Sequence, residues 1–233
     1  MNKLLCGDCS DLMTSFQKDS IDLILTDIPY GISYKSNKQN CDTRNNKSLK
    51  KDRKEYFQSI QGDDYLPTSW LHDAFRILKS NSAIYIFCHW STWHLLFPAV
   101  EDVGFTCKNM IVMNKSNHGM GDLKGQYAPK HELLLYATKG RHILNFPDKR
   151  MNDIWDVPVK YSGSKRLHPN EKPTRWLTPC ILNSSKKGDI VLDPFCGSGA
   201  TGEAATILDR CYILIDIDKK YIEVAKKRME DLK

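Results

Sequence analysis

The sequence predicts an α/β fold with a mainly parallel sheet and helices on both faces. Short apolar runs of strand character alternate along the chain with segments of helical spacing, which is typical of layered α/β proteins. Two of these runs end at a carboxylate, Asp27 and Asp193, where such sheets place their ligand sites. The 233 residues suffice for one domain, and they contain no internal repeat or long linker.

The first half of the chain predicts four strands separated by three helices. Leu12, Met13 and Phe16 lie at helical spacing in the first helix, and Pro67 suits the first turn of the second. Gly104 is suited to ending the third helix. The expected strands lie at residues 1–8, 21–26, 83–88 and 105–113, and the expected helices at 10–16, 67–78 and 92–102.

The second half predicts three more strands and three more helices. Pro173 suits the first turn of one helix, and Asp218 can cap the last one. Residues 141–172 show little periodicity and indicate irregular but packed chain. The expected strands lie at residues 133–137, 190–193 and 211–215, and the expected helices at 173–184, 200–208 and 218–232.

The positive charge of the chain is concentrated in one polar segment. The chain has 34 basic and 28 acidic residues, and eight basic against three acidic residues lie between Gly31 and Ile60. Residues 32–64 have no sustained apolar periodicity, so one interpretation is a solvated loop. Because long irregular segments of compact domains are often functional, the other interpretation is a mobile basic flap that lies along phosphates.

The cysteines indicate a reducing compartment. Cys88, Cys180 and Cys211 fall inside apolar segments, and no signal peptide precedes them. Cys6 and Cys9 have the spacing of a zinc or redox motif, but no second pair completes four ligands, so no metal is expected. Reduced cysteines favour a cytoplasmic protein. No apolar run is long enough to span a membrane, so we expect no membrane partner.

A glycine-rich loop between a strand and a helix indicates a nucleotide-containing cofactor. Gly197, Gly199 and Gly202 have the spacing of the dinucleotide fingerprint, and Asp216 follows at the distance of a carboxylate that binds ribose hydroxyls. An NAD-dependent oxidoreductase is therefore the first hypothesis. Only 31 of the 233 residues follow Gly202, however, so the remaining strands must come from earlier in the chain, as in a circular permutation.

The residues before these glycines favour a different cofactor. Asp193 and Phe195 add an acid and an aromatic ring to the loop. Nearby carboxylates repel a pyrophosphate, whereas they attract a cationic sulfonium. The loop therefore fits S-adenosyl-L-methionine better than a dinucleotide. The alternative is a tight turn that uses glycine only for packing.

A second loop lies at the end of the strand predicted at 21–26. Asp27 is followed by Ile28, the stiff Pro29 and the aromatic Tyr30, which Gly31 leaves unobstructed. A carboxylate, a fixed carbonyl and a flat ring together form a socket for a planar hydrogen-bonding group, such as the amine of a nucleobase.

Taken together, the two motifs resemble those of the amino-methylating DNA methyltransferases. The segment 26–30 looks like the catalytic motif of that family, and 193–199 looks like its cofactor motif. Their order, with the catalytic motif first, is that of the β group. The resemblance covers nearly the whole chain and includes further motifs: Gly7-Asp8, Lys115, His131-Glu132, Lys139-Gly140 and His168-Pro169-x-x-Lys172-Pro173.

The chain departs from the pattern of that family at two positions. The residue after the catalytic Asp is usually Pro, and here it is Ile28, which keeps the carbonyl but lacks the fixed φ angle. Met113 stands two residues before Lys115, where the family more often has Trp.

The resemblance implies a Rossmann-like methyltransferase fold with permuted motif order, in a single domain over residues 1–233. It also implies a DNA-contacting flap at 32–64 and a target-recognition insertion around 114–130. The expected catalytic residues are Asp27, Ile28, Pro29 and Tyr30. The expected cofactor-binding residues are Asp8, Cys9, Asp27, His168, Lys172, Thr174, Asp193, Phe195, Gly197, Ser198, Gly199, Ala200, Thr201 and Asp216. The candidate DNA-binding residues are Lys35, Lys38, Lys47, Lys50, Lys51 and Arg53.

The reaction that the resemblance implies is methyl transfer from S-adenosyl-L-methionine to N6 of an adenine flipped out of double-stranded DNA, as in restriction-modification. An acid at position 27 goes mostly with adenine in that family, and Ser with cytosine. N4-cytosine methylation is the main alternative, followed by the oxidoreductase and by a non-enzymatic DNA-binding module. A homodimer is compatible with the resemblance, and the recognised DNA sequence cannot be read from the chain.

Overall fold

The computed structural model describes residues 2–31, 65–119, 124–146, 149–157 and 172–232. The predicted flap at 32–64 lies outside the described residues, together with its six candidate DNA-binding side chains. His168 of the predicted cofactor site lies outside them as well. Within the described ranges, no helix is long and apolar enough to cross a membrane.

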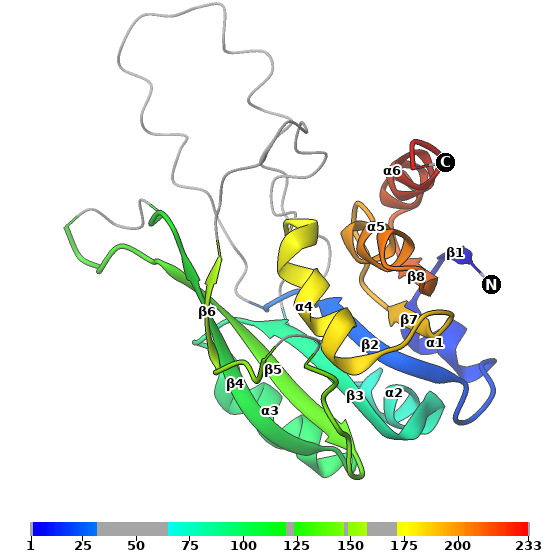
Figure 1. The fold of residues 1–233 in the computed structure, drawn as a ribbon, viewed down its shortest axis with the longest axis horizontal. Coiled ribbons are helices and arrows are strands. Elements are labelled where there is room, and N and C mark those ends of the chain that lie inside the picture. Colours follow the sequence, from blue (N-terminus) through cyan, green and yellow to red (C-terminus); the bar gives the residue numbers. More distant parts are fainter. Residues whose placement is uncertain (1, 32–64, 120–123, 147–148, 158–171, 233) are drawn as a thin grey trace, which may run out of the picture.

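One mixed sheet runs through the molecule (Figure 1). In the described part of the chain its order is β1-β8-β7-β2-β3-β5-β4-β6, so strands from the two ends of the sequence lie side by side. The strands are β1 (Lys3–Cys6), β2 (Ile21–Asp27), β3 (Leu78–Cys88), β4 (Thr106–Lys115), β5 (His131–Lys139), β6 (Ile154–Val157), β7 (Ile190–Asp193) and β8 (Cys211–Asp216).

The sheet is mainly parallel, which confirms the prediction from the sequence. The strands β1, β8, β7, β2 and β3 form consecutive parallel pairs. The exception is β5, which lies between β3 and β4 and runs antiparallel to both. Since β6 is parallel to β4, every strand except β5 points in the same direction.

Helices cover both faces of this sheet (Figure 1). Buried side chains of α1, α2 and α3 share one apolar cluster with the sheet, and those of α4, α5 and α6 share the other. The helices are α1 (Cys9–Thr14), α2 (Leu71–Ile77), α3 (Trp93–Asp102), α4 (Thr174–Ser184), α5 (Ala200–Ile207) and α6 (Lys219–Glu230).

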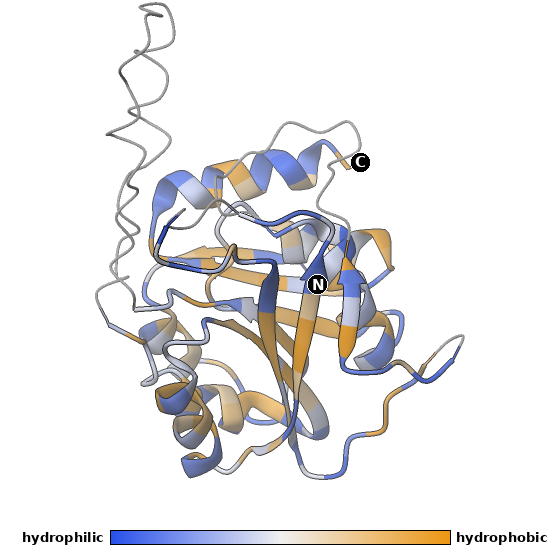
Figure 2. Ribbon diagram, turned by 90° about the vertical axis from the view of Figure 1, so that its left-hand side faces the viewer, coloured by the Kyte–Doolittle hydropathy of each residue, from blue (hydrophilic) through white to orange (hydrophobic). Residues whose placement is uncertain are grey.

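The central strands are buried on both faces. Leu23 and Leu25 of β2 pack into the cluster beneath α4, α5 and α6, whereas Ile24 between them packs into the opposite cluster. Because both faces are covered, these strands are continuous apolar runs without the alternation of a half-exposed strand. Figure 2 shows the hydrophobic colour concentrated on the strands between the helical layers.

Several elements differ from the prediction, and the strand predicted at 83–88 already begins at Leu78. The helix predicted at 67–78 begins at Leu71 and ends at Ile77, because Leu78 already pairs with Ile21 as the first residue of β3. The segment 141–172, predicted to be irregular, contains β6. This strand has four residues, which are too few for an alternating pattern to stand out in the sequence.

A buried polar chain connects the sheet to α4. Ser184 Oγ lies 2.9 Å from Tyr85 Oη and 3.0 Å from His142 Nε2, while His142 Nδ1 lies 3.0 Å from the carbonyl oxygen of Asn81. Since a carbonyl can only accept, Nδ1 carries the proton and Nε2 accepts from Ser184. Burial lowers the pKa of His142, which favours this neutral ring.

We predict that Ser184→Ala lowers the free energy of unfolding by about 1–3 kcal/mol, because it leaves the buried Tyr85 and the partly buried His142 without their shared partner. Urea denaturation of both proteins measures the difference. Ser15→Ala is the matched control, since Ser15 is an exposed serine after α1, and its change is expected to stay within about 0.5 kcal/mol. Equal losses in the two variants would contradict the assignment.

Candidate active site

Three carboxylates lie at the ends of three neighbouring strands. Asp27, Asp193 and Asp216 are the last residues of β2, β7 and β8, which are parallel and adjacent in the sheet. Glu132 lies near the start of β5, and because β5 runs in the opposite direction, it reaches the same edge. This edge is where open α/β sheets bind their ligands.

Asp193 links the two predicted motifs. Its Oδ1 accepts a 2.7 Å hydrogen bond from Thr26, the residue before Asp27, and its Oδ2 accepts one of 2.6 Å from Thr201 in α5. The backbone N–H of Phe195 donates to Oδ1 at 3.1 Å. Burial, with the charge of the neighbouring Asp27 adding to it, raises the pKa of Asp193 to about 7 despite the three donors.

The loop between β7 and α5 combines packing glycines with an open one. A Cβ atom on Gly199 would lie 2.8 Å from the Cβ of Ala225, and one on Gly202 would lie 2.6 Å from Cδ1 of Leu214. A Cβ on Gly197 would meet nothing within 4 Å. Gly199 and Gly202 therefore allow close packing. Gly197 instead borders open space at the edge of the sheet, and we call the backbone around it the cradle.

The backbone of this cradle is fixed by Asp216. The Oδ2 of Asp216 accepts a 2.8 Å bond from the N–H of Gly197, whose φ of +49° lies in the left-handed region. Its Oδ1 accepts a 2.9 Å bond from the N–H of Asp218. Burial raises the pKa of Asp216 above its usual value. Asp216 therefore fixes the backbone of the glycine loop as well as lying at the ligand-binding edge of the sheet.

Asp8 and Cys9 lie beside Asp216, on the neighbouring strand end. Cys6 pairs with Asp216, and the N–H of Gly7 donates to the Asp216 carbonyl at 3.0 Å. The exposed Asp8 caps α1 by accepting from Ser10 N–H at 2.8 Å. Cys9 is buried, and burial raises the pKa of its thiol to about 12.

The other predicted cofactor residues lie on or near the glycine loop. Phe195 packs edge-on against Trp70, with ring centroids 5.5 Å apart. Ser198 is buried and lies 3.5 Å from Nη1 of Arg228. Thr174, at the start of α4, donates to Glu203 of α5 at 2.9 Å. Ala200, the first residue of α5, is buried.

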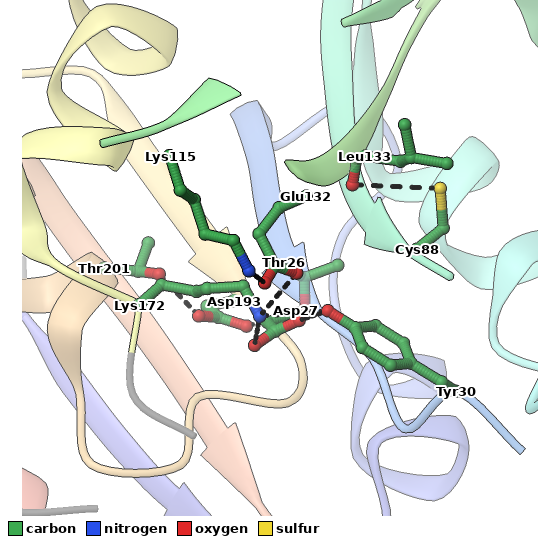
Figure 3. A network of polar contacts seen from close by, with 10 residues as sticks. All are labelled: Thr26, Asp27, Tyr30, Cys88, Lys115, Glu132, Leu133, Lys172, Asp193 and Thr201. Carbon is green, nitrogen blue, oxygen red and sulfur yellow. Dashed lines mark hydrogen bonds and ion pairs between the residues drawn. The ribbon is translucent and has the colours of Figure 1, made fainter. Parts of the chain in front are cut away.

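Asp27 forms a compact polar contact with Tyr30 and Lys172 (Figure 3). Tyr30 donates its hydroxyl to Oδ1 of Asp27 at 2.7 Å, and Lys172 Nζ donates to Oδ2 at 2.9 Å. Lys172 also donates to the Tyr30 hydroxyl at 2.9 Å. Burial raises the pKa of Tyr30, with the charge of Asp27 adding to it, so the phenol keeps its proton.

The ion pairs continue through Glu132 to Lys115. Lys115 Nζ lies 2.9 Å from Oε1 of Glu132, and Lys172 Nζ lies 3.9 Å from its Oε2. Burial alone would lower the pKa of Lys172, but the carboxylates of Asp27 and Glu132 raise it well above its usual value. Burial likewise opposes the ionised form of Glu132, but the two lysines hold its pKa below its usual value.

Several features of this site were missed by the sequence reasoning. Lys115 and Glu132 entered only as motif positions without a role, and Lys172 was expected beside the cofactor, whereas its Nζ contacts Asp27. The ring of His89, which follows β3, stacks near Tyr30 with centroids 6.0 Å apart. Ile28, in place of the usual Pro, is anchored by burial, with 2% of its surface exposed.

The family to which the chain belongs follows from a sequence comparison. The model of a family described as DNA methylase, the N6/N4 methyltransferases, matches residues 21–227 and thus includes both Asp27 and the glycine loop. This chain belongs to the DNA methylase family. Its activity is therefore methylation of DNA at an amino group. This activity explains why the loop with Asp27 and Tyr30 lies beside the glycine loop.

Individual relatives agree with this assignment to the DNA methylases. The chain is 31% identical to the Type II methyltransferase M2.MboI of Moraxella bovis, over 97% of the chain and 86% of that protein. It is 28% identical to the Type II methyltransferase M.HinfI of Haemophilus influenzae, over 100% of the chain and 69% of that protein.

Solved structures share the fold of this methylase. The complex of M1.HpyAVI with SAM has a TM-score of 0.74 at 24% identity, covering 98% of this chain and 100% of that one. The cytosine-N4-specific PvuII DNA methyltransferase also has a TM-score of 0.74, at 16% identity, covering 98% of this chain and 86% of that one. A shared fold therefore does not discriminate between the two target bases.

We predict that Asp193→Asn becomes more stable relative to the wild type as the pH rises from about 5 to about 8. The folded-state pKa of Asp193, about 7, exceeds its usual value of 3.8, so the folded chain holds a proton that the unfolded chain has lost. The stabilising contribution of this proton is complete at low pH and disappears as the pH rises through 7.

Urea denaturation at a series of pH values measures this effect, which is expected to be on the order of a few kcal/mol across the range. Asp209→Asn is the control, because Asp209 is exposed and Lys187 holds its pKa below the usual value, outside the range tested. Parallel stability curves for wild type and Asp193→Asn would contradict the prediction.

Proposed function

We propose that this DNA methylase transfers the methyl group of S-adenosyl-L-methionine to N6 of an adenine in double-stranded DNA. The single observation that carries the proposal is the hydrogen bond of 2.7 Å from Thr26 to Asp193. It joins the segment 27–31, which we call the acceptor loop, to the glycine loop at 194–199. We assign the chain to the β group, since its acceptor motif precedes its cofactor motif in the sequence.

The edge formed by β1, β8 and β7 supplies the residues that would hold the cofactor. When bound, S-adenosyl-L-methionine supplies an electrophilic methyl group on a positively charged sulfur. Burial raises the pKa values of Asp193 and Asp216, and a bound cation would stabilise their ionised forms, whereas a pyrophosphate would oppose them. The open cradle at Gly197 leaves room for a ligand against the backbone, and Asp8 and Phe195 lie beside it.

The acceptor loop supplies hydrogen-bond acceptors and an aromatic surface. The exocyclic amine of adenine is a weak nucleophile, because its lone pair is conjugated with the ring. Asp27 and the carbonyl of Ile28 accept its two N–H bonds, which favours a nitrogen whose lone pair is free to attack, while Tyr30 stacks on the base. Catalysis then rests on positioning and electrostatics, and no covalent enzyme intermediate is needed.

An acid at position 27 favours adenine over cytosine as the target, by the resemblance stated above. The fold supports both, since a cytosine-N4-specific enzyme shares it. An NAD-dependent oxidoreductase is disfavoured, because the strand ends around the cradle carry Asp193 and Asp216. A DNA-binding module without catalysis would leave the Thr26–Asp193 connection unexplained.

The DNA substrate requires access to a base inside a duplex. The target base must be rotated out of the helix, at a cost of a few kcal/mol. We assign phosphate contacts to the basic residues of 32–64 and sequence choice to the insertion around 114–130. In the described part of that insertion, Gly119 N–H donates to the Pro129 carbonyl at 2.8 Å, and Tyr127 is fully exposed. A cytoplasmic location and a homodimer stay predictions.

Incubation with S-adenosyl-L-methionine labelled in the methyl group and mixed-sequence duplex DNA tests the proposal, followed by identification of the methylated nucleoside. We predict label in N6-methyl-2′-deoxyadenosine. Label confined to N4-methyl-2′-deoxycytidine would show that the target base is cytosine and not adenine, and the absence of any transfer would remove the proposed function.

The same assay tests the role of Asp27. Asp27→Ala should reduce transfer by at least about a hundredfold, because the amine loses the acceptor on which the attack depends. Cofactor binding, measured by calorimetry, is expected to stay measurable. Asp209→Ala is the control, since Asp209 is an exposed acid after α5 that pairs with Lys187. Activity retained in Asp27→Ala would exclude Asp27 as the catalytic acceptor.

A further inference from the structure

Lys172 lies between two carboxylates of the active site. Its Nζ is 2.9 Å from Oδ2 of Asp27 and 3.9 Å from Oε2 of Glu132, and 12% of its side chain is exposed. It also donates to the hydroxyl of Tyr30 at 2.9 Å. Figure 3 shows the lysine reaching across the site between the two acids.

A second lysine holds Glu132 in place. Lys115 Nζ bonds to Oε1 of Glu132 at 2.9 Å, while Oε2 faces Lys172. The side chains of Lys115 and Glu132 are 17% and 25% exposed. The four charges therefore alternate in sign from Asp27 through Lys172 and Glu132 to Lys115, and they balance.

The contact between Lys172 and Asp27 conflicts with methyl transfer, on the function proposed above. During transfer the attacking nitrogen gains positive charge, and Asp27 is the acceptor that faces it. A lysine cation on the same carboxylate competes for Oδ2 and repels the developing charge. The site therefore needs a second position for the ammonium group of Lys172.

We propose that Glu132 is a positioning residue that receives Lys172 from Asp27 when the acceptor amine arrives. A movement of Nζ by about 1 Å would bring the distance of 3.9 Å to Oε2 into hydrogen-bonding range, well within the reach of a flexible four-carbon side chain. The lysine stays paired in both positions, so no unpaired charge is buried. Asp27 is then left to Tyr30 and the amine.

This role differs from that of a fixed scaffold in one measurable way. If the four charges only hold the site in shape, removing one of them slows methyl transfer, and removing a second one slows it further. In the proposed exchange, Glu132→Gln leaves Lys172 with Asp27 as its remaining close carboxylate partner, so the amine must compete with it. Removing Lys172 as well restores the balance, because Asp27 and Lys115 then carry one charge each.

Single-turnover methyl transfer to duplex DNA at saturating cofactor tests the proposal. Glu132→Gln is expected to slow transfer about tenfold, which corresponds to about 1.4 kcal/mol in the barrier, with unchanged affinity for S-adenosyl-L-methionine. The double variant Glu132→Gln, Lys172→Met is expected to transfer faster than Glu132→Gln alone. Asp209→Asn, the same chemical change in an exposed ion pair, is the control and is expected to match the wild type.

Two outcomes would overturn the proposal. Wild-type transfer rates in Glu132→Gln would show that the lysine needs no second partner, and a double variant as slow as Glu132→Gln or slower would indicate a scaffold. If Glu132→Gln does not fold, Glu132→Asp replaces it. The shorter side chain keeps the charge but withdraws the carboxylate from Lys172, so transfer is expected to slow, and a wild-type rate would contradict the exchange.

The outcomes also separate this proposal from the proposed function. A wild-type protein that methylates no DNA removes the function, and the exchange with it. A wild-type protein that methylates DNA, with Glu132→Gln equally active, removes only the exchange.

Discussion

The hydrogen bond between Thr26 and Asp193 is the contact on which the active site depends. It joins residues 167 positions apart in the sequence, at 2.7 Å and in the interior. The backbone pairs between β2 and β7 are Leu23 with Val191 and Ile24 with Leu192. The side-chain bond between Thr26 and Asp193 extends the contact to the ends of both strands. The acceptor loop and the glycine loop are thereby held as one unit.

Placing several carboxylates at one edge of the sheet costs electrostatic free energy. The two halves of the site compensate for this cost in different ways. On the cofactor side, burial raises the pKa values of Asp193 and Asp216, so a bound cation is the natural partner for these acids. On the acceptor side, Lys172 already neutralises Asp27. Under the proposed function one side attracts a positive ligand, and under the proposed exchange the other releases its own cation before the amine binds.

Much of the fold could be predicted because its signals are local. Apolar runs and the carboxylates that end them identified the central strands, and the parallel arrangement brought Asp27 and Asp193 to one edge. The Lys172–Glu132 pair could not be predicted, since it depends on β5 entering the sheet against the direction of its neighbours, which is a long-range pairing without a local signal. The burial of Ile28, which stands where the resembling family usually has Pro, likewise depends on packing between distant segments.

The affinity of S-adenosyl-L-methionine for Thr26→Val, measured by calorimetry in the absence of DNA, tests the central connection most directly. Valine keeps the shape of threonine but cannot donate to Asp193. If Thr26 holds the cofactor side in place from the acceptor strand, affinity should fall about fivefold, in line with the loss of about 1 kcal/mol for one buried hydrogen bond, and Thr26→Ser should retain it. Equal affinity in wild type and Thr26→Val would show that the two loops form their sites independently.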